Sequence, residues 1–322
     1  MTAAAVPTGS LSSPPSDAAS HKIAITGITG MVGQALAERL RSRGSSVLGI
    51  SRSASKKHPD NILWNSESGI TEPGRLESID TVVHLAGENI AGGRWNEQLK
   101  QRIHDSRVHG TRSLVKSLGA ISKRPATLIC ASAIGYYGDR GDHVLDENAA
   151  AGSGFLADTC REWEAEALAA EKLGVRVVCV RIGVVLSRNG GALTRMLLPF
   201  QLGLGGIVGP GTQYWSWIGL NDLVRIIEFC VDHSELSGAV NAVSPEPSTN
   251  REFTRTLGSV LSRPTLFPLP AFMARLVLGE MAQDLLLAST RVIPAALLRR
   301  GFQFEQPSLK ECLTYELSQG KR

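Results

Sequence analysis

Three glycines stand at three-residue intervals near the start of the chain, in the run Thr26-Gly-Ile-Thr-Gly-Met-Val-Gly33. The run follows a β-branched segment, residues 22–26, and leads into residues 31–43, whose apolar positions have helical spacing. In such a strand–turn–helix unit the glycines allow a tight turn, close approach to a pyrophosphate and close helix packing, and the helix N-terminus offers free N–H groups. The pattern therefore predicts a pyrophosphate site, with a plain turn as the alternative. Its expected cofactor-binding residues are Gly27, Thr29, Gly30, Met31, Val32 and Gly33.

The segment after this helix decides which dinucleotide would bind. A chain of this kind that binds NAD carries an acidic residue about 20 positions after the glycines, which holds the ribose 2′-hydroxyl. Here residues 49–53 read Gly-Ile-Ser-Arg-Ser and contain no carboxylate. Arg52 is able to stack on an adenine and pair with a 2′-phosphate, so the sequence favours NADP. The alternative is that Arg52 is a solvated loop residue.

The elements that must position these residues alternate along the chain. Strand-like segments at 22–26, 46–50, 61–63, 81–85, 126–132 and 175–181 are separated by helical patterns at 31–43, 95–118 and 155–173. This alternation predicts an α/β fold, a Rossmann doubly wound parallel sheet over residues 21–187. After residue 187, helical pieces at 193–202, 221–232, 250–262 and 270–281 indicate a smaller C-terminal substrate lobe, residues 188–315, with segments that return to the sheet. Residues 1–20 are rich in Ala, Ser and Pro, and we expect a disordered leader.

Composition excludes several classes of protein. The chain of 322 residues has 34 Lys and Arg against 30 Asp and Glu, a net charge of +4 that is too small and dispersed for nucleic-acid binding. No apolar run is long enough to span a membrane. The five cysteines form no C-x-x-C pair, which argues against disulfides and structural zinc. His104, His109, His143 and His233 lack metal-ligand spacing, so we predict no metal. Reduced core cysteines indicate a cytoplasmic protein, with organellar import as the alternative.

Several phrases, in order, resemble the extended short-chain dehydrogenase/reductase superfamily. They are the glycine run, His84-Leu-Ala-Gly87, Ser132-Ala-Ile-Gly-Tyr-Tyr-Gly138 and Arg181. Leu85-Ala-Gly-Glu-Asn-Ile90 and Trp215-Ser-Trp-Ile218 resemble an atypical "epimerase family" group within it, and Leu278-Gly-Glu280 resembles the C-terminal domain of unknown function of that group. The resemblance covers roughly residues 21–315.

This resemblance implies further cofactor contacts. Ser51 and Arg52 would hold the 2′-phosphate of NADP, and Leu85, Ala86 and Gly87 would line the cofactor. Arg102 and Arg107 would reach it from the long helix, unless they are surface cations. The helices at 95–118 and 155–173 form a dimer interface in this superfamily, which implies a possible homodimer.

The chain departs from the family at the residues that carry the chemistry. Standard members use a Ser or Thr with a Tyr-x-x-x-Lys pair, but residues 155–166 contain neither Tyr nor Lys. The only candidates to replace them in this region are Asp158, Glu162, Glu164 and, further on, Lys172. The remaining catalytic candidates are Ser132, Tyr136 and Tyr137, each with a packing or hydrogen-bonding alternative.

The substrate lobe departs as well. Trp215 stands where sugar-nucleotide enzymes carry an arginine, and Val184 replaces an asparagine. These changes favour a flatter, apolar small-molecule substrate lined by Tyr137, Tyr214, Trp215 and Trp217, with core packing as the alternative. Glu88 faces the substrate pocket in this architecture and is an acid/base candidate.

Three functions follow from these residues. The first is an NADP-dependent oxidoreductase or epimerase with a non-standard proton donor. The second is a non-catalytic NADP-binding sensor or scaffold. The third, an interaction protein without a cofactor, gives no role to Arg52 beside an intact glycine run.

Overall fold

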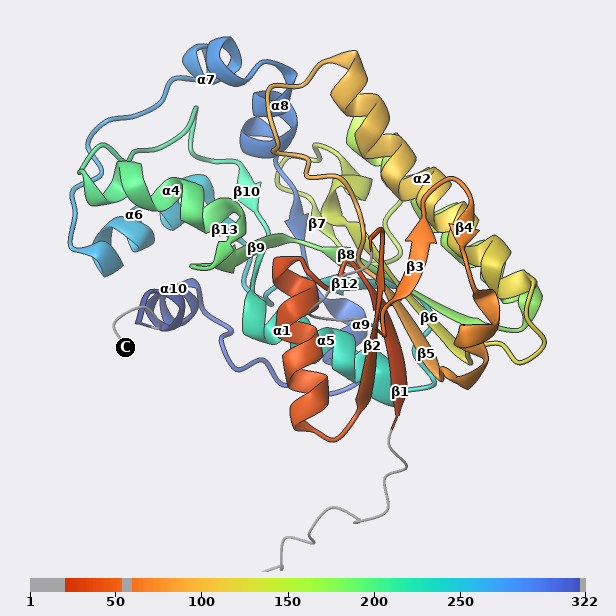
Figure 1. Cartoon of the computed structure of the whole chain (residues 1–322). Helices are drawn as coiled ribbons and strands as arrows, with labels where there is room; N and C mark the ends of the chain where they lie inside the picture. The colour runs from red at the N-terminus through yellow and green to blue at the C-terminus, as the bar shows by residue number, and fades with distance from the viewer. Residues whose placement is uncertain (1–20, 54–59, 319–322) are drawn as a thin grey trace, which may run out of the picture.

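The computed structural model describes residues 21–53 and 60–318, and the expected leader lies outside them. An eight-stranded sheet in the order β12-β8-β6-β5-β1-β2-β3-β4 runs through the centre of the chain (Figure 1). All neighbours pair in parallel except β3 and β4. The strands are β1 (Lys22–Thr26), β2 (Ser46–Ser51), β3 (Ile62–Asn65), β4 (Gly69–Ile70), β5 (Thr81–His84), β6 (Thr127–Ala133), β8 (Arg176–Ile182) and β12 (Gly238–Ala242).

Helices cover both faces of this sheet. On one side lie α1 (Met31–Ser42) and α5 (Leu220–Asp232), and on the other α2 (Glu97–Gly119) and α3 (Phe155–Leu168) (Figure 1). Each side buries its own apolar core: Leu36 of α1 and Ile226 of α5 pack in one cluster, and Leu114 of α2 and Trp163 of α3 in the other. The arrangement confirms the predicted α/β Rossmann fold, a doubly wound parallel sheet.

The helix ends differ from the sequence prediction by a few residues. Helix α2 starts at Glu97 because the Asn96 side chain caps it, accepting a hydrogen bond of 2.8 Å from the Leu99 amide. Trp95, expected inside this helix, packs against Leu99 in a small apolar cluster. The 3₁₀ turn η3 (Ala169–Leu173) follows α3 without a break and completes the helix expected at 155–173.

The other elements of the chain are short, and most of them belong to the C-terminal lobe. Strand β9 (Val184–Ser187) pairs with β11 (Trp217–Gly219), β10 (Tyr214–Trp215) with β13 (Ser248–Thr249), and β14 (Arg291–Val292) with β7 (Val144–Leu145). The remaining elements are η1 (Pro73–Ser78), η2 (Ile134–Tyr137), α4 (Gly191–Gln201), α6 (Asn250–Leu261), α7 (Ala271–Leu278), α8 (Glu280–Ala282), η4 (Gln283–Leu287), α9 (Ala295–Arg299) and α10 (Leu309–Ser318). The lobe returns β12 to the main sheet, where it pairs with β8.

One expected helix is interrupted in this lobe. Residues 270–281 divide into α7 and α8 at Gly279, whose φ of +65° is a left-handed conformation that favours glycine. A Cβ atom at Gly279 would also lie 3.1 Å from the Arg94 side chain, so the break lets this segment approach the start of α2 closely. Among the described helices, none combines the length and apolar character that crossing a membrane requires. All five cysteines are buried free thiols.

Candidate functional site

The predicted pyrophosphate turn joins β1 to α1. Gly27 has a φ of +66°, and a Cβ atom there would lie 3.0 Å from the Leu85 carbonyl oxygen of the loop after β5. A Cβ atom at Gly33 would lie 2.3 Å from the Gly27 oxygen, so only glycine allows the helix to sit this close to the turn. Gly30 is the N-cap of α1, and no side chain caps the first turn. The first-turn amides therefore have no side-chain acceptor, and they suit an anion such as pyrophosphate.

A buried chain of three side chains fixes this turn against the next strand. The Thr26 hydroxyl oxygen accepts hydrogen bonds from the Leu85 and Ala86 amides at 3.0 and 3.1 Å. Its proton is therefore directed at His84 Nδ1, 2.8 Å away, and His84 Nε2–H donates to the Thr111 hydroxyl at 3.1 Å. Burial lowers the pKa of His84 to about 4, so the imidazole is neutral. The chain positions Leu85, Ala86 and Gly87 beside the glycine turn.

The nucleotide-selecting residues lie at the end of β2. Ser51 is half-buried, and its hydroxyl donates to the Ser53 carbonyl oxygen at 2.9 Å. Arg52 is exposed and has no hydrogen-bond or ion-pair partner among the residues that the structure describes. Its guanidinium is available to a phosphate group.

A second unpaired guanidinium lies beside the loop after β5. A Cβ atom at Gly87 would be 3.3 Å from Arg107 Cζ, and Arg107 Nη1 donates to the Glu88 carbonyl oxygen at 3.0 Å. The guanidinium also lies 5.3 Å from the centre of the Trp163 ring. Burial lowers the pKa of Arg107, and no described carboxylate lies within ion-pair distance of it. Arg102 is exposed instead, and its Nε lies 3.9 Å from Glu88 Oε1.

Ser132 and Tyr137 belong to a buried hydrogen-bond network centred on Arg181. Ser132 and Arg181 are neighbours across β6 and β8, and both bind Glu164 of α3. The Ser132 hydroxyl donates to Glu164 at 2.6 Å, and Arg181 donates two hydrogen bonds of 2.8 Å to its two carboxylate oxygens. Arg181 also donates to the Tyr137 hydroxyl at 2.9 Å, which donates in turn to Asn241 at 2.7 Å. Burial raises the pKa of Tyr137 to about 12, so this phenol holds its proton at neutral pH.

Tyr136 has a different environment from its neighbour. Its ring is half-buried, and Arg181 Cζ lies 3.5 Å from the ring centre. Its hydroxyl has no hydrogen-bond partner within the described part of the chain. Tyr136 follows β6 in η2, so it lies at the carboxyl edge of the sheet, as do the glycine turn after β1 and the loop after β5. Among the three catalytic candidates it is the one whose hydroxyl has no partner among the described residues.

The inner face of α3 lacks the expected acid and base. Leu156, Cys160 and Glu164 follow one another at four-residue spacing, which places them on one face of the helix. A Cβ atom at Gly135 would lie 3.2 Å from Leu156 Cβ and 3.9 Å from Cys160 Sγ. Burial raises the pKa of Cys160 to about 11, so this thiol is not a base at neutral pH.

The other acidic residues of α3 contact basic side chains instead. Asp158 binds Arg161 at 2.9 Å, Glu162 binds His104 at 2.9 Å, and Glu166 binds Arg112 at 2.6 Å. Glu164, a candidate acid by sequence, is neutralised by Arg181. Sequence reasoning missed this pair and the role of Asn241. The register of β6, β8 and β12 places Ser132, Arg181 and Asn241 beside one another, and their spacing in the sequence does not show it.

The four aromatic residues expected in a substrate pocket occupy three environments. Trp215 and Trp217 are buried in the core of the C-terminal lobe, and Tyr137 is buried in a separate cluster with Leu145 and Val292. The two indole N–H groups donate to the Leu286 carbonyl oxygen and the Ser248 hydroxyl. Tyr214 is half-buried, with Arg291 Cζ 4.7 Å from its ring centre. Core packing, the alternative in the sequence analysis, accounts for both indoles.

Comparisons with known proteins cover nearly the whole chain. The NAD dependent epimerase/dehydratase family matches residues 23–242, and a domain of unknown function, DUF1731, matches residues 269–316. An epimerase family protein of Mycobacterium bovis is 45% identical over 293 residues, which are 91% of this chain and 96% of that protein. The human epimerase family protein SDR39U1 is 36% identical over 295 residues, 91% of this chain and 98% of that protein.

Two solved structures are similar to this chain over 92% of its length. The crystal structure of human SDR39U1 (isoform 2) with NADPH has a TM-score of 0.84 and 34% identity, and the match covers 92% of this chain and 99% of that chain. A nucleoside-diphosphate sugar epimerase from Corynebacterium glutamicum has a TM-score of 0.77 and 33% identity, with 92% of this chain and 59% of that chain covered.

Proposed function

The chain belongs to the NAD dependent epimerase/dehydratase family and carries a C-terminal DUF1731 module, and from this premise we propose that it is an NADP(H)-dependent hydride-transfer enzyme. The substrate class is a small carbonyl or alcohol compound. The reaction is a net oxidation or reduction, or an epimerisation in which the hydride returns to the same carbon. The observation that carries the proposal is the Tyr136 hydroxyl, which has no hydrogen-bond partner among the described residues and lies at the carboxyl edge of the sheet, where the glycine turn also lies.

The residues present fit a bound dinucleotide. The glycine turn leaves no room for a Cβ atom at Gly33, and the uncapped start of α1 offers amides to the pyrophosphate. Arg52 has no partner among the described residues, and we place the adenosine 2′-phosphate at its guanidinium, which favours NADP(H) over NAD(H). Arg107 supplies a second cation beside Gly87. NADPH in the structure of human SDR39U1 supports the same choice.

Tyr136 is the group that we assign to proton transfer. A bound nicotinamide supplies or accepts a hydride at a substrate carbon. The Tyr136 hydroxyl would donate its proton to the carbonyl oxygen in reduction and become a phenolate, and in oxidation the Tyr136 phenolate would accept the proton of the alcohol. Arg181 stacks on the Tyr136 ring and holds its orientation. Ser132 and Tyr137 position Arg181 and Glu164 rather than touching the substrate.

Cofactor occupancy is the first test. Nucleotide extracted from the purified protein would be identified by mass spectrometry, and emptied protein would be titrated with NADPH and NADH. We expect NADPH to bind more tightly, and Arg52→Ala to weaken NADPH binding about 10- to 100-fold because one charge-assisted contact is lost. NADH affinity should fall much less, because NADH shares the adenine but lacks the 2′-phosphate. Arg299→Ala is a matched control, because Arg299 is an exposed arginine on α9 without a described partner. Equal affinity of wild type and Arg52→Ala for NADPH would contradict the assignment.

Turnover is the second test. The wild-type protein would be screened for NADPH oxidation with a panel of aldehydes and ketones. We expect Tyr136→Phe to lower kcat at least about 100-fold, as the loss of a general acid does, with the Kd of NADPH unchanged. Tyr315→Phe is the control, because Tyr315 is an exposed phenol on α10. Full activity of Tyr136→Phe would reassign the proton donor.

A second function has a specific observation in its favour. Leu156 and Cys160 present no acid or base on the inner face of α3, and Ser132 and Tyr137 are committed to the Arg181 network. A protein of this kind would be an NADP(H)-binding sensor or scaffold without turnover. It would bind NADPH as tightly, oxidise none of the panel, and bind a protein partner differently with and without the cofactor. The homodimer and the cytoplasmic location stay predictions.

A further inference from the structure

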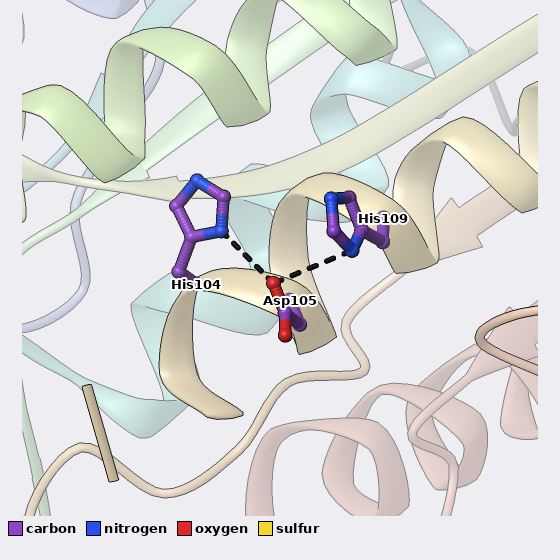
Figure 2. Close-up of side chains that lie close together, drawn as sticks. All are labelled: His104, Asp105 and His109. Atoms are coloured by element: carbon purple, nitrogen blue, oxygen red, sulfur yellow. Dashed lines mark hydrogen bonds and ion pairs between the residues drawn. The ribbon is translucent and has the colours of Figure 1, made fainter. Parts of the chain in front are cut away.

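A cluster of two imidazoles and one carboxylate lies on the outer face of α2, away from the residues assigned to the cofactor. His104, Asp105 and His109 place one ligand atom each within 4.8 Å of one another. Figure 2 shows both histidine rings directed at the same Asp105 oxygen. His104 Nδ1 lies 3.1 Å and His109 Nδ1 3.3 Å from Asp105 Oδ1. These two histidines are five residues apart in the sequence, which is not a spacing typical of metal ligands.

The hydrogen bonding of His104 requires a cation. Its Nδ1 faces Asp105, and its Nε2 faces Glu162 of α3 at 2.9 Å. A neutral imidazole carries one N–H group, so it can donate to only one of these carboxylates and turns a lone pair toward the other. Gln101 already donates to the same Asp105 oxygen at 2.8 Å, and the nearby Arg112 is bound to Glu166 at 2.6 Å. A second proton or a metal ion on His104 resolves the conflict.

The distances fit a metal ion. In a tetrahedral site with ligands about 2.0–2.1 Å from the metal, neighbouring ligand atoms lie about 3.3 Å apart. The two nitrogen–oxygen distances, 3.1 and 3.3 Å, match that separation, and the three ligand atoms all lie within 4.8 Å of one another. Glu162 on the far nitrogen of His104 is the carboxylate–histidine arrangement that orients metal-bound imidazoles.

We propose that His104, Asp105 and His109 bind one divalent transition-metal ion, zinc in preference to magnesium or calcium, with water at the open position. Two imidazole nitrogens and one carboxylate oxygen are a ligand set that zinc accepts, whereas magnesium and calcium prefer oxygen ligands. The bound ion orders His104, which Glu162 links to α3, and so ties α2 to α3. The inward side of α2 carries Arg107, so the metal is separate from the proposed hydride-transfer site.

The test is zinc stoichiometry on the full chain, without a histidine tag and after treatment with a chelator. Zinc chloride would be titrated calorimetrically, and zinc retained after dialysis would be counted by mass spectrometry. We expect one zinc per wild-type chain. His109→Ala should weaken zinc binding at least about 100-fold, and Glu162→Gln about 10- to 100-fold, the usual effect of an outer-shell partner. His143→Ala, the loss of an exposed histidine outside the cluster, should change nothing.

A second measurement does not depend on a variant. Cobalt(II) added to the wild-type chain should produce the intense visible spectrum of a tetrahedral site, and zinc should abolish it. Equal zinc uptake by wild type and His109→Ala, no uptake by wild type, or a cobalt spectrum of the hydrated ion alone would each overturn the proposal. Those results would leave a second proton as the cation on His104.

Discussion

At the scale of single residues, Glu164 decides which hydroxyls remain available for chemistry. It binds Ser132 and Arg181 in the interior of the protein, and Arg181 donates a hydrogen bond to the Tyr137 hydroxyl. Ser132 is therefore bound by Glu164 and Tyr137 by Arg181, whereas the Tyr136 hydroxyl has no hydrogen-bond partner among the described residues. Because the pair is buried, removing one charge leaves the other without compensation.

We predict that Glu164→Gln lowers the free energy of unfolding by about 3 kcal/mol, since the Arg181 charge stays buried without its counter-ion. The matched control is Glu166→Gln, two residues along the same helix, which removes the exposed ion pair with Arg112. That change should cost no more than about 1 kcal/mol. Urea denaturation of the three proteins measures both effects. Similar losses in the two variants would show that the buried network does not support the fold.

Sequence identified some of these residues and not others for a physical reason. Gly27 and Gly33 were predictable because the turn is local, and its geometry excludes side chains at fixed spacing. The role of Glu164 depends on Arg181, which β8 places beside Ser132 of β6. Such a partnership exists only once the strands are in register, and the sequence alone does not show it.

At the scale of elements, the sequence located most helices and strands but not their ends. Packing and capping set the ends, as Asn96 does for α2 and Gly279 does for α7. Helix α10 carries a buried acidic residue. Its Glu316 is buried without an ion-pair partner among the described residues and accepts a hydrogen bond from the Arg188 amide at 3.2 Å. It lines a cavity of about 530 Å³ between α10 and α1.

Burial raises the pKa of Glu316, more than the Arg188 amide lowers it. A carboxyl with a raised pKa in the folded state stabilises the protein below its unfolded pKa, and this contribution is lost as the pH rises through the folded value. The charged form of Glu316 is therefore disfavoured in the folded protein, and it costs stability at neutral pH. We predict that Glu316→Gln stabilises the protein at pH 7 by about 0.5–2 kcal/mol and that the gain shrinks toward pH 4.

Thermal denaturation of both proteins between pH 4 and 8 measures this difference. Glu38→Gln is the control, because Glu38 lines the same cavity but is exposed. If the stability gain of Glu316→Gln does not change with pH, or if Glu38→Gln gives the same gain, the titration of Glu316 is not its cause.

At the scale of the whole molecule, the C-terminal lobe completes the core of the nucleotide-binding sheet. Leu297 and Phe302 pack in the same apolar cluster as Leu36 of α1 and Ile226 of α5. The fully buried Asp222 of α5 accepts hydrogen bonds from the backbone amides of residues 305 and 306, at 3.0 and 2.9 Å. Strand β12, from the same lobe, lies at the edge of the main sheet. The division at residue 187 therefore separates two parts of the sequence whose side chains share one apolar core.

This shared core predicts that the protein unfolds as one cooperative unit and that NADPH stabilises both lobes together. In calorimetry, the measured enthalpy should equal the van't Hoff enthalpy of a single transition. NADPH at about 100 times its Kd should add about 2.7 kcal/mol to the free energy of unfolding. Because β1 and α10 would open in the same transition, hydrogen exchange should slow equally for the most protected amides of both. Two transitions, or protection gained by β1 but not α10, would mean that the lobes fold independently and that the packing of Leu297 and Phe302 in the cluster of Leu36 is a docking surface between domains.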